Sequence, residues 1–149
     1  MKRTTITQIN LFNELWRETN AIYEEWAKKY GLSYYELLVV LSLSEGGNHR
    51  TQKDIVTQWL LPKQTVNTIL KGFLARGWVT LIPNDEDRRN KSIALTETGR
   101  EFMHKISREL NEHECRAWDE MGPECTKALL DGMALYNRLF REEHKNEHA

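Results

Sequence analysis

Long stretches of this sequence carry apolar residues at helical spacing, and few turn-forming residues separate them. Between residues 6 and 30, aromatic and aliphatic side chains recur at steps of three, four or seven. The 149 residues include 8 glycines and 3 prolines, too few for the turns of a many-stranded sandwich or barrel. The sequence therefore predicts a mainly α-helical protein, and its length suits a single domain.

Local signals mark where the second helix starts and stops. Ser33, followed three residues later by Glu36, forms a capping box ahead of the apolar stretch 37–43. Gly31 stands where the glycine that ends a preceding helix is expected. We expect the second helix to stop at Gly46.

Two further short helices are predicted next. Thr51, with Asp54 three positions on, offers an N-cap for a helix that ends near residue 59. Pro62 suits a first helical turn, so the following helix is expected to open there and to run to residue 76.

The second half of the chain predicts a hairpin and two helices. Residues 78–82 and 92–95 are rich in strand formers and flank the polar stretch 84–91, which is typical of a β-hairpin. Residues 96–99 cap a long helix, which we expect to be interrupted at 121–123 before a last helix and a frayed tail.

Positive charge is concentrated in the middle of the chain. Residues 50–91 carry eight basic and four acidic side chains, a net charge of +4, whereas residues 1–49 and 92–149 have net charges of −1 and −4. A local basic segment suits a polyanionic partner. The helix at 62–76 has amides, hydroxyls and lysines but no carboxylate, which favours contact with base edges and phosphates. An ordinary solvated helix face is the alternative.

The order of elements predicts a winged helix-turn-helix over residues 32–96. The flanking helices, 5–30 and 97–142, carry more apolar surface than such a unit can cover, so we expect them to pair with a second copy. A two-fold dimer would present two reading heads to half-sites spaced about 10 bp apart. The predicted fold is mainly α with a small β-hairpin, a winged helix-turn-helix between N- and C-terminal dimerisation helices.

Three segments, 54–67, 74–79 and 87–99, together resemble the MarR (multiple antibiotic resistance regulator) family of transcription factors. The resemblance covers nearly the whole chain, so 1–149 is taken as a single MarR-like domain. It implies a cytoplasmic, homodimeric regulator, more often a repressor, that recognises a pseudopalindromic operator in double-stranded DNA. The sequence departs from the family pattern at Asn84 and Glu86, where many members carry Asp and Arg.

The resemblance also implies residue roles. Arg89 would reach into the minor groove with Asp87 holding its guanidinium, while Arg88 and Lys91 would meet phosphates. Four polar residues of the helix would lie near base edges and three basic residues would bind phosphates without reading sequence. The first set is Gln64, Thr65, Asn67 and Thr68, and the second is Lys63, Lys71 and Arg50.

The resemblance also implies an effector, because MarR family regulators are often released from DNA by a small aromatic or phenolic ligand. The ligand is held in a cleft between the dimer helices and the winged unit. Six aromatic residues are candidates to line such a cleft: Trp16, Tyr23, Trp26, Tyr34, Tyr35 and Trp118. Plain core or dimer packing is the alternative for each of them.

Other functions have weaker signals. Cys115 and Cys125 could serve a redox-sensing regulator, although two reduced, partly buried thiols are the simpler expectation. No metal site or cofactor is predicted, and an enzyme is disfavoured because the sequence has no glycine-rich phosphate loop, nucleophile elbow or HExxH helix. A winged helix that binds a protein instead of DNA stays open.

The sequence predicts no contact with membranes. The N-terminus lacks the apolar block of a secretory signal, which favours a cytoplasmic protein. The longest aliphatic run, 37–41, is much shorter than the roughly 20 residues that cross a bilayer.

Overall fold

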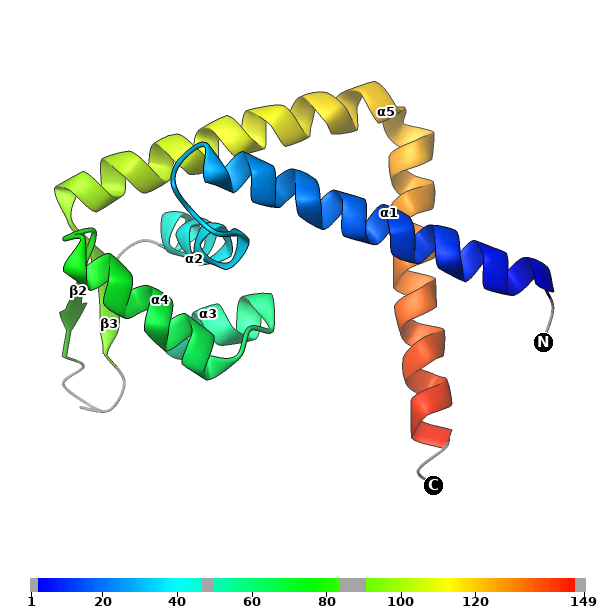
Figure 1. Ribbon diagram of the computed structural model, residues 1–149, viewed down its shortest axis with the longest axis horizontal. Helices are drawn as coiled ribbons and strands as arrows, with labels where there is room; N and C mark the ends of the chain where they lie inside the picture. The colour runs from blue at the N-terminus through cyan, green and yellow to red at the C-terminus, as the bar shows by residue number, and fades with distance from the viewer. Residues whose placement is uncertain (1–2, 47–49, 84–90, 147–149) are drawn as a thin grey trace. The chain divides into compact units, whose positions relative to one another are not determined.

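The computed structural model describes residues 3–46, 50–83 and 91–146 (Figure 1). The chain divides into two compact units, Met1–Ser107 and Arg108–Ala149. The elements in order are α1 (Arg3–Lys28), α2 (Tyr34–Glu45), β1 (Arg50–Thr51), α3 (Gln52–Trp59), α4 (Lys63–Ala75), β2 (Val79–Ile82), β3 (Ser92–Leu95) and α5 (Glu97–Asn146). The prediction of a mainly helical winged helix-turn-helix with a small antiparallel sheet is confirmed.

The predicted capping box at Ser33 and the predicted N-cap at Thr51 both form, and the second is a capping box as well. At the start of α2, the Ser33 amide donates to Glu36 Oε2 at 2.8 Å, and the Glu36 amide donates to Ser33 Oγ at 3.2 Å. At the start of α3, Thr51 and Asp54 exchange the same two bonds, also at 2.8 and 3.2 Å. These side chains satisfy amides that have no partner inside the helix, which is why both helices begin where the sequence predicts.

The first unit is built around α2. Leu37, Leu38, Val39, Val40 and Leu43 are all buried, and the exposed side chains of α2 lie near its ends, at Tyr35 and Glu45 (Figure 1). The rest of the core comes from the apolar faces of α3 and α4, from the sheet and from the start of α5, with Ile55, Phe73, Ile93, Met103 and Ile106 fully covered. This packing fixes α3 and α4 against one another.

The sheet has three strands in the order β1-β3-β2. The predicted hairpin pairs Val79 with Leu95 and Ile82 with Ser92, antiparallel. Strand β1 was not predicted. It is two residues long, and its partner strand, where Arg50 pairs with Ile93, is far away in sequence, so no local pattern marks it.

The turn between α3 and α4 depends on Leu60. This residue adopts a left-handed conformation with φ of 52° and is 88% exposed, while Leu61 next to it is buried. Pro62 precedes α4 as its N-cap, so the helix begins one residue later than predicted.

A compact junction holds the hairpin to α4 and α5. The ring of Trp78 lies 5.2 Å from that of Phe73 and 4.5 Å from that of Phe102, centroid to centroid. Thr96 Oγ1 donates to Gly77 O at 2.6 Å and accepts from the Gly99 amide at 3.0 Å, which caps α5 as predicted. The hairpin therefore leaves α4 at a fixed position.

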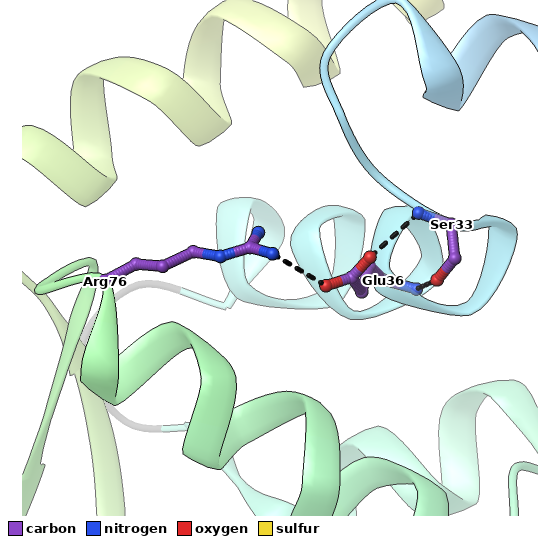
Figure 2. A network of polar contacts seen from close by, with 3 residues as sticks. All are labelled: Ser33, Glu36 and Arg76. Atoms are coloured by element: carbon purple, nitrogen blue, oxygen red, sulfur yellow. Dashed lines mark hydrogen bonds and ion pairs between the residues drawn. The ribbon is translucent and has the colours of Figure 1, made fainter.

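A polar network ties the end of α4 to the start of α2. Arg76 Nη2 lies 3.6 Å from Glu36 Oε1, so the carboxylate of the capping box also meets a cation from α4 (Figure 2). The Arg76 guanidinium stands 4.8 Å from the Trp78 ring centroid, in the range of a cation–π contact.

The helix of the second unit is interrupted as predicted. Gly122, with φ of 74° and ψ of 165°, breaks the helical backbone of α5 just before Pro123. None of the described side chains between Asn111 and His144 is buried. No helix in the described ranges is long and apolar enough to cross a membrane.

Candidate nucleic-acid interface

Helix α4 separates its apolar and polar residues cleanly. Val66, Ile69, Leu70 and Phe73 are buried, because they recur at steps of three and four and face the core. Lys63, Gln64, Thr68 and Lys71 are exposed, and Thr65 and Asn67 are half-buried. The helix contains no acidic residue, so its outer surface is positive.

A groove of about 520 Å³ lies beside α4, and we call it the lysine groove. Its lining comes from α3, α4, the hairpin strands and the residue just before β3. The polar lining residues are Gln52, Lys53, Lys63, Asn67, Lys71 and Lys91, and the aliphatic ones are Val56, Leu70, Leu74, Leu81 and Ile93. None of these residues is acidic, so the groove concentrates four positive charges.

The structure brings together some of the residues predicted to bind DNA. Lys63, Asn67, Lys71 and Lys91 share the lysine groove, although Lys91 is distant in sequence from the other three. Gln64 and Thr68 are exposed on α4 outside the groove lining, and Thr68 Oγ1 donates to Gln64 O at 3.0 Å. Thr65 is likewise outside that lining.

The other predicted contacts lie elsewhere. Arg50 belongs to β1, and its side chain lies against Gly46, away from the groove lining. Asp87, Arg88 and Arg89 lie outside the described residues, so their roles at the tip of the hairpin stay predictions.

Two polar residues of the groove, Gln52 and Lys53, were not predicted from the sequence. Lys53 lies in the first turn of α3 and is exposed, and its neighbour Gln52 donates from Nε2 to the carbonyl of Lys63 at 3.0 Å. That bond joins the first residues of α3 and α4. The charge count over residues 50–91 included Lys53, but its place beside α4 follows from the turn at Leu60, which has no sequence signal.

Asp54, the acidic residue of α3, is engaged in the N-terminal cap of its own helix. Asp54 accepts hydrogen bonds from the Thr51 amide and from Thr51 Oγ1, both at 2.8 Å. The backbone bond, the side-chain bond and the nearby Arg50 and Lys53 charges lower the pKa of the Asp54 carboxyl, against a smaller effect of burial. Asp54 is therefore charged at neutral pH and engaged in the cap.

Some of the aromatic residues predicted to hold a ligand meet where α1 joins α2. The rings of Tyr23 and Tyr34 are 6.3 Å apart and those of Tyr34 and Tyr35 are 5.9 Å apart, centroid to centroid. Burial, and then the proximity of Tyr35, raise the pKa of the Tyr34 hydroxyl. Trp26 is buried and packs on Tyr30 at 4.8 Å, which accounts for it as a core residue.

The remaining two aromatic candidates are not part of that group. Trp16 is 59% exposed on α1, and Trp118, 41% exposed, belongs to the second unit. The aromatic ligand site as a whole stays a prediction.

The cysteines differ from expectation. Cys115 and Cys125 are both free and both exposed, where partly buried thiols were expected. Within the single chain no helix face here is covered, since none of the described side chains from Asn111 to His144 is buried. Within the described ranges, no three His, Cys, Asp or Glu side chains gather as a metal site would require.

Comparison with known proteins agrees with this geometry. Residues 30–90, which include α2 to β2, match a model described as the MarR family. The HTH-type transcriptional regulator Hpr of Shouchella clausii is 28% identical over 103 residues, which are 69% of this chain and 52% of that protein. The chain thus spans about half the length of this relative.

Solved structures share the fold along nearly the whole chain. NMB1585, a MarR family regulator from Neisseria meningitidis, aligns with a TM-score of 0.79 at 24% identity and covers 94% of this chain and 98% of its own. The MepR–DNA complex of S. aureus aligns with a TM-score of 0.68 at 16% identity, over 88% of this chain and 96% of that one. The match at residues 30–90 makes this segment similar to the MarR family, and the whole chain shares the winged helix-turn-helix fold of MarR family regulators.

Proposed function

We propose that this protein is a transcriptional regulator, acting as a repressor in the cytoplasm, that binds a pseudopalindromic operator in double-stranded DNA as a homodimer. The observation that carries the proposal is the basic surface of the first unit. The lysine groove gathers Lys53, Lys63, Lys71 and Lys91 beside the carboxylate-free helix α4. Such a surface complements a polyanion, and α4 offers amides and hydroxyls that suit base edges.

The winged helix-turn-helix fold indicates how this basic surface would bind DNA. In this fold the second helix of the helix-turn-helix enters the major groove, and a flanking wing approaches the neighbouring minor groove. That assignment makes α4 the reading helix, with Gln64 and Thr68 exposed for base contacts. The solved relative MepR, described as a complex with DNA, supports the same partner for this chain.

Uncovered apolar surface supports the homodimer. On α1, Ile9, Leu15, Trp16 and Ile22 are each between 47% and 59% exposed. In the second unit, Leu129, Leu130, Tyr136 and Phe140 are between 45% and 66% exposed. Exposed apolar surface of this extent favours burial against a partner. A second copy of the chain carries the same apolar faces and could bury them in a two-fold dimer.

An effector belongs to the proposal as well. The tyrosine group of Tyr23, Tyr34 and Tyr35 could stack on a small aromatic or phenolic ligand. A ligand that prefers a conformation with the wrong spacing of the reading helices would release the operator.

A mobility-shift assay with the DNA that flanks the protein's own coding region tests the main proposal. We expect a shift that weakens steeply with salt and that is reduced by Arg89→Ala and by the double variant Lys63→Gln/Lys71→Gln. Equal affinity for the flanking DNA and for random duplex would contradict operator recognition. Absence of duplex binding at any salt concentration would instead favour a winged helix that docks a protein.

A further inference from the structure

We propose that the lysine groove holds the phosphates of one DNA strand, with Lys53 as a phosphate-binding residue and Asn67 as a backbone contact instead of a base contact. This inference rests on the proposed function, because it sorts the contacts that the same interface makes with DNA. It adds Lys53 to the interface and moves Asn67 from the base-reading set to the backbone-binding set.

The spacing of the lysines suits a row of phosphates. Lys63 and Lys71 both line the groove and are eight residues apart on α4, a rise of about 12 Å along the helix. Successive phosphates of one strand are closer together than this, so the two lysines can meet different phosphates of one strand. Lys53 and Lys91 reach the same groove from α3 and from the entry to β3.

The rest of the lining suits a sugar–phosphate chain. Lysine binds phosphate as a point charge and reads no sequence. Aliphatic side chains, among them Val56 and Leu81, line the same groove and match the carbon atoms of deoxyribose. None of the lining residues in the described part of the chain is a carboxylate that would repel the phosphates.

Lys53 is held in place relative to α4. The bond from Gln52 Nε2 to the Lys63 carbonyl, at 3.0 Å, ties the first turn of α3 to the first residue of α4. Lys53 follows Gln52 directly and begins the same helix, so its charge stays beside Lys63. Gln52 acts here as a positioning residue.

Asn67 shares the lysine side of α4. It lies four residues from Lys63 and four from Lys71, and all three line the groove. Gln64 and Thr68 are each one residue further along, about 100° around the helix, and are exposed outside the lining. Helix α4 thus has a stripe for the backbone and a separate stripe for the bases.

The salt dependence of DNA binding tests Lys53. Fluorescence anisotropy with a 30-bp duplex of random sequence, at about 50 to 200 mM salt, gives the slope of log K against log salt. Because a dimer carries two copies of each substitution, we expect Lys53→Gln and Lys63→Gln each to lower the slope by about 1.8, so that wild type loses about 12-fold more affinity than either variant over this range. Lys105→Gln, an exposed lysine of α5 outside the groove, is the matched control and should keep the wild-type slope.

The outcomes separate this inference from the proposed function. If Lys53→Gln keeps the wild-type slope while Lys63→Gln lowers it, Lys53 is no phosphate contact and the inference is overturned. If the wild-type protein has no salt-dependent affinity for duplex DNA, the proposed function is overturned together with it.

A second measurement tests Asn67. Affinities are measured for a duplex selected in vitro from a random pool and for the random duplex, and their ratio reports base reading. We expect Asn67→Ala to weaken both duplexes equally and Gln64→Ala to lower the ratio at least about fivefold. Asn67→Asp keeps the shape of the side chain and adds a charge that phosphates repel, so it should weaken both duplexes further. A lowered ratio for Asn67→Ala, in a variant that unfolds at the wild-type temperature, would overturn the assignment.

Discussion

At the scale of single residues, the cap of α3 links the helix-turn-helix to pH. The two hydrogen bonds from Thr51 lower the pKa of Asp54 in the folded protein. A carboxyl with a lowered folded-state pKa contributes stability that is present above its unfolded pKa of about 4 and is lost as the pH falls through the folded value. We therefore expect Asp54→Asn to lose less stability than wild type on acidification from pH 7 to pH 3, as measured by urea unfolding.

At neutral pH, Asp54→Asn should be less stable than wild type by about 1 kcal/mol, because the asparagine amide is a weaker acceptor in the capping box than the aspartate carboxylate. Glu101→Gln, on an exposed face of α5, is the control and should follow the acid response of wild type. An Asp54→Asn profile parallel to that of wild type at every pH would show that the cap does not carry this dependence.

Two glycines should respond in opposite directions to a methyl group. At Gly99, which is buried, an added Cβ would stand 1.9 Å from the Trp78 carbonyl oxygen, so the junction of hairpin and α5 must open to accept it. Gly99→Ala should cost about 1–3 kcal/mol, as overpacking does. At Gly72, within α4, an added Cβ meets nothing within 4 Å, and Gly72→Ala should stabilise the protein by about 0.5–1 kcal/mol. Urea unfolding of both variants checks the two signs, and equal effects would refute the packing argument.

At the scale of elements, the turn between α3 and α4 stores strain at Leu60. Its left-handed conformation costs a leucine about 1–2 kcal/mol, whereas asparagine adopts that conformation more readily. Because Leu60 is 88% exposed, little apolar burial is lost on replacing it. Leu60→Asn should raise the free energy of unfolding by about 0.5–1 kcal/mol.

The neighbouring position supplies the contrast. Leu61 is 7% exposed, and Leu61→Asn should lower the free energy of unfolding by about 2–4 kcal/mol, since an amide replaces an aliphatic chain in the core. Thermal unfolding followed by circular dichroism measures both variants. A Leu60→Asn protein that is less stable than wild type would mean that the side chain has a contact worth more than the strain.

Elements with local causes were predictable, and elements with distant causes were not. The boxes at Ser33 and Thr51 join residues three apart, so their sequence signals suffice. The break at Gly122 likewise follows from the glycine and the proline after it. By contrast, β1 exists because Arg50 pairs with Ile93, and the conformation of Leu60 is imposed by the packing of α3 against α4.

The candidate site likewise has a part that the sequence predicts and a part that depends on tertiary packing. The polar content of α4 can be read along the chain, because every residue of its outer stripe lies within one helix. The lysine groove could not be predicted from the sequence. Lys53, Lys71 and Lys91 are brought together by the turn at Leu60 and by the pairing of the hairpin strands. Charge counts locate the basic segment, whereas tertiary packing decides which of its charges share a groove.

At the scale of the whole molecule, the second unit carries an exposed apolar stripe that suits a partner. Residues 129, 133, 136 and 140 recur at steps of four, three and four and form one stripe of Leu, Met, Tyr and Phe, each at least 36% exposed. A helix with so little buried surface is marginal in water by itself. A stripe of this spacing on a two-fold related copy would cover it.

Met133→Lys together with Phe140→Lys should therefore dissociate the dimer. Two charges on an exposed helix cost little in a monomer, but two buried, unpaired charges in an interface cost several kcal/mol. Sedimentation equilibrium should give twice the chain mass of 17.6 kDa for wild type and a single chain mass for the variant. Glu142→Lys, on the opposite side of the helix and exposed, changes charge at least as much per site and should keep the dimer mass. If the stripe variant also keeps that mass, the dimer is held together by a surface other than this stripe, and the proposed role of the stripe in the dimer is wrong.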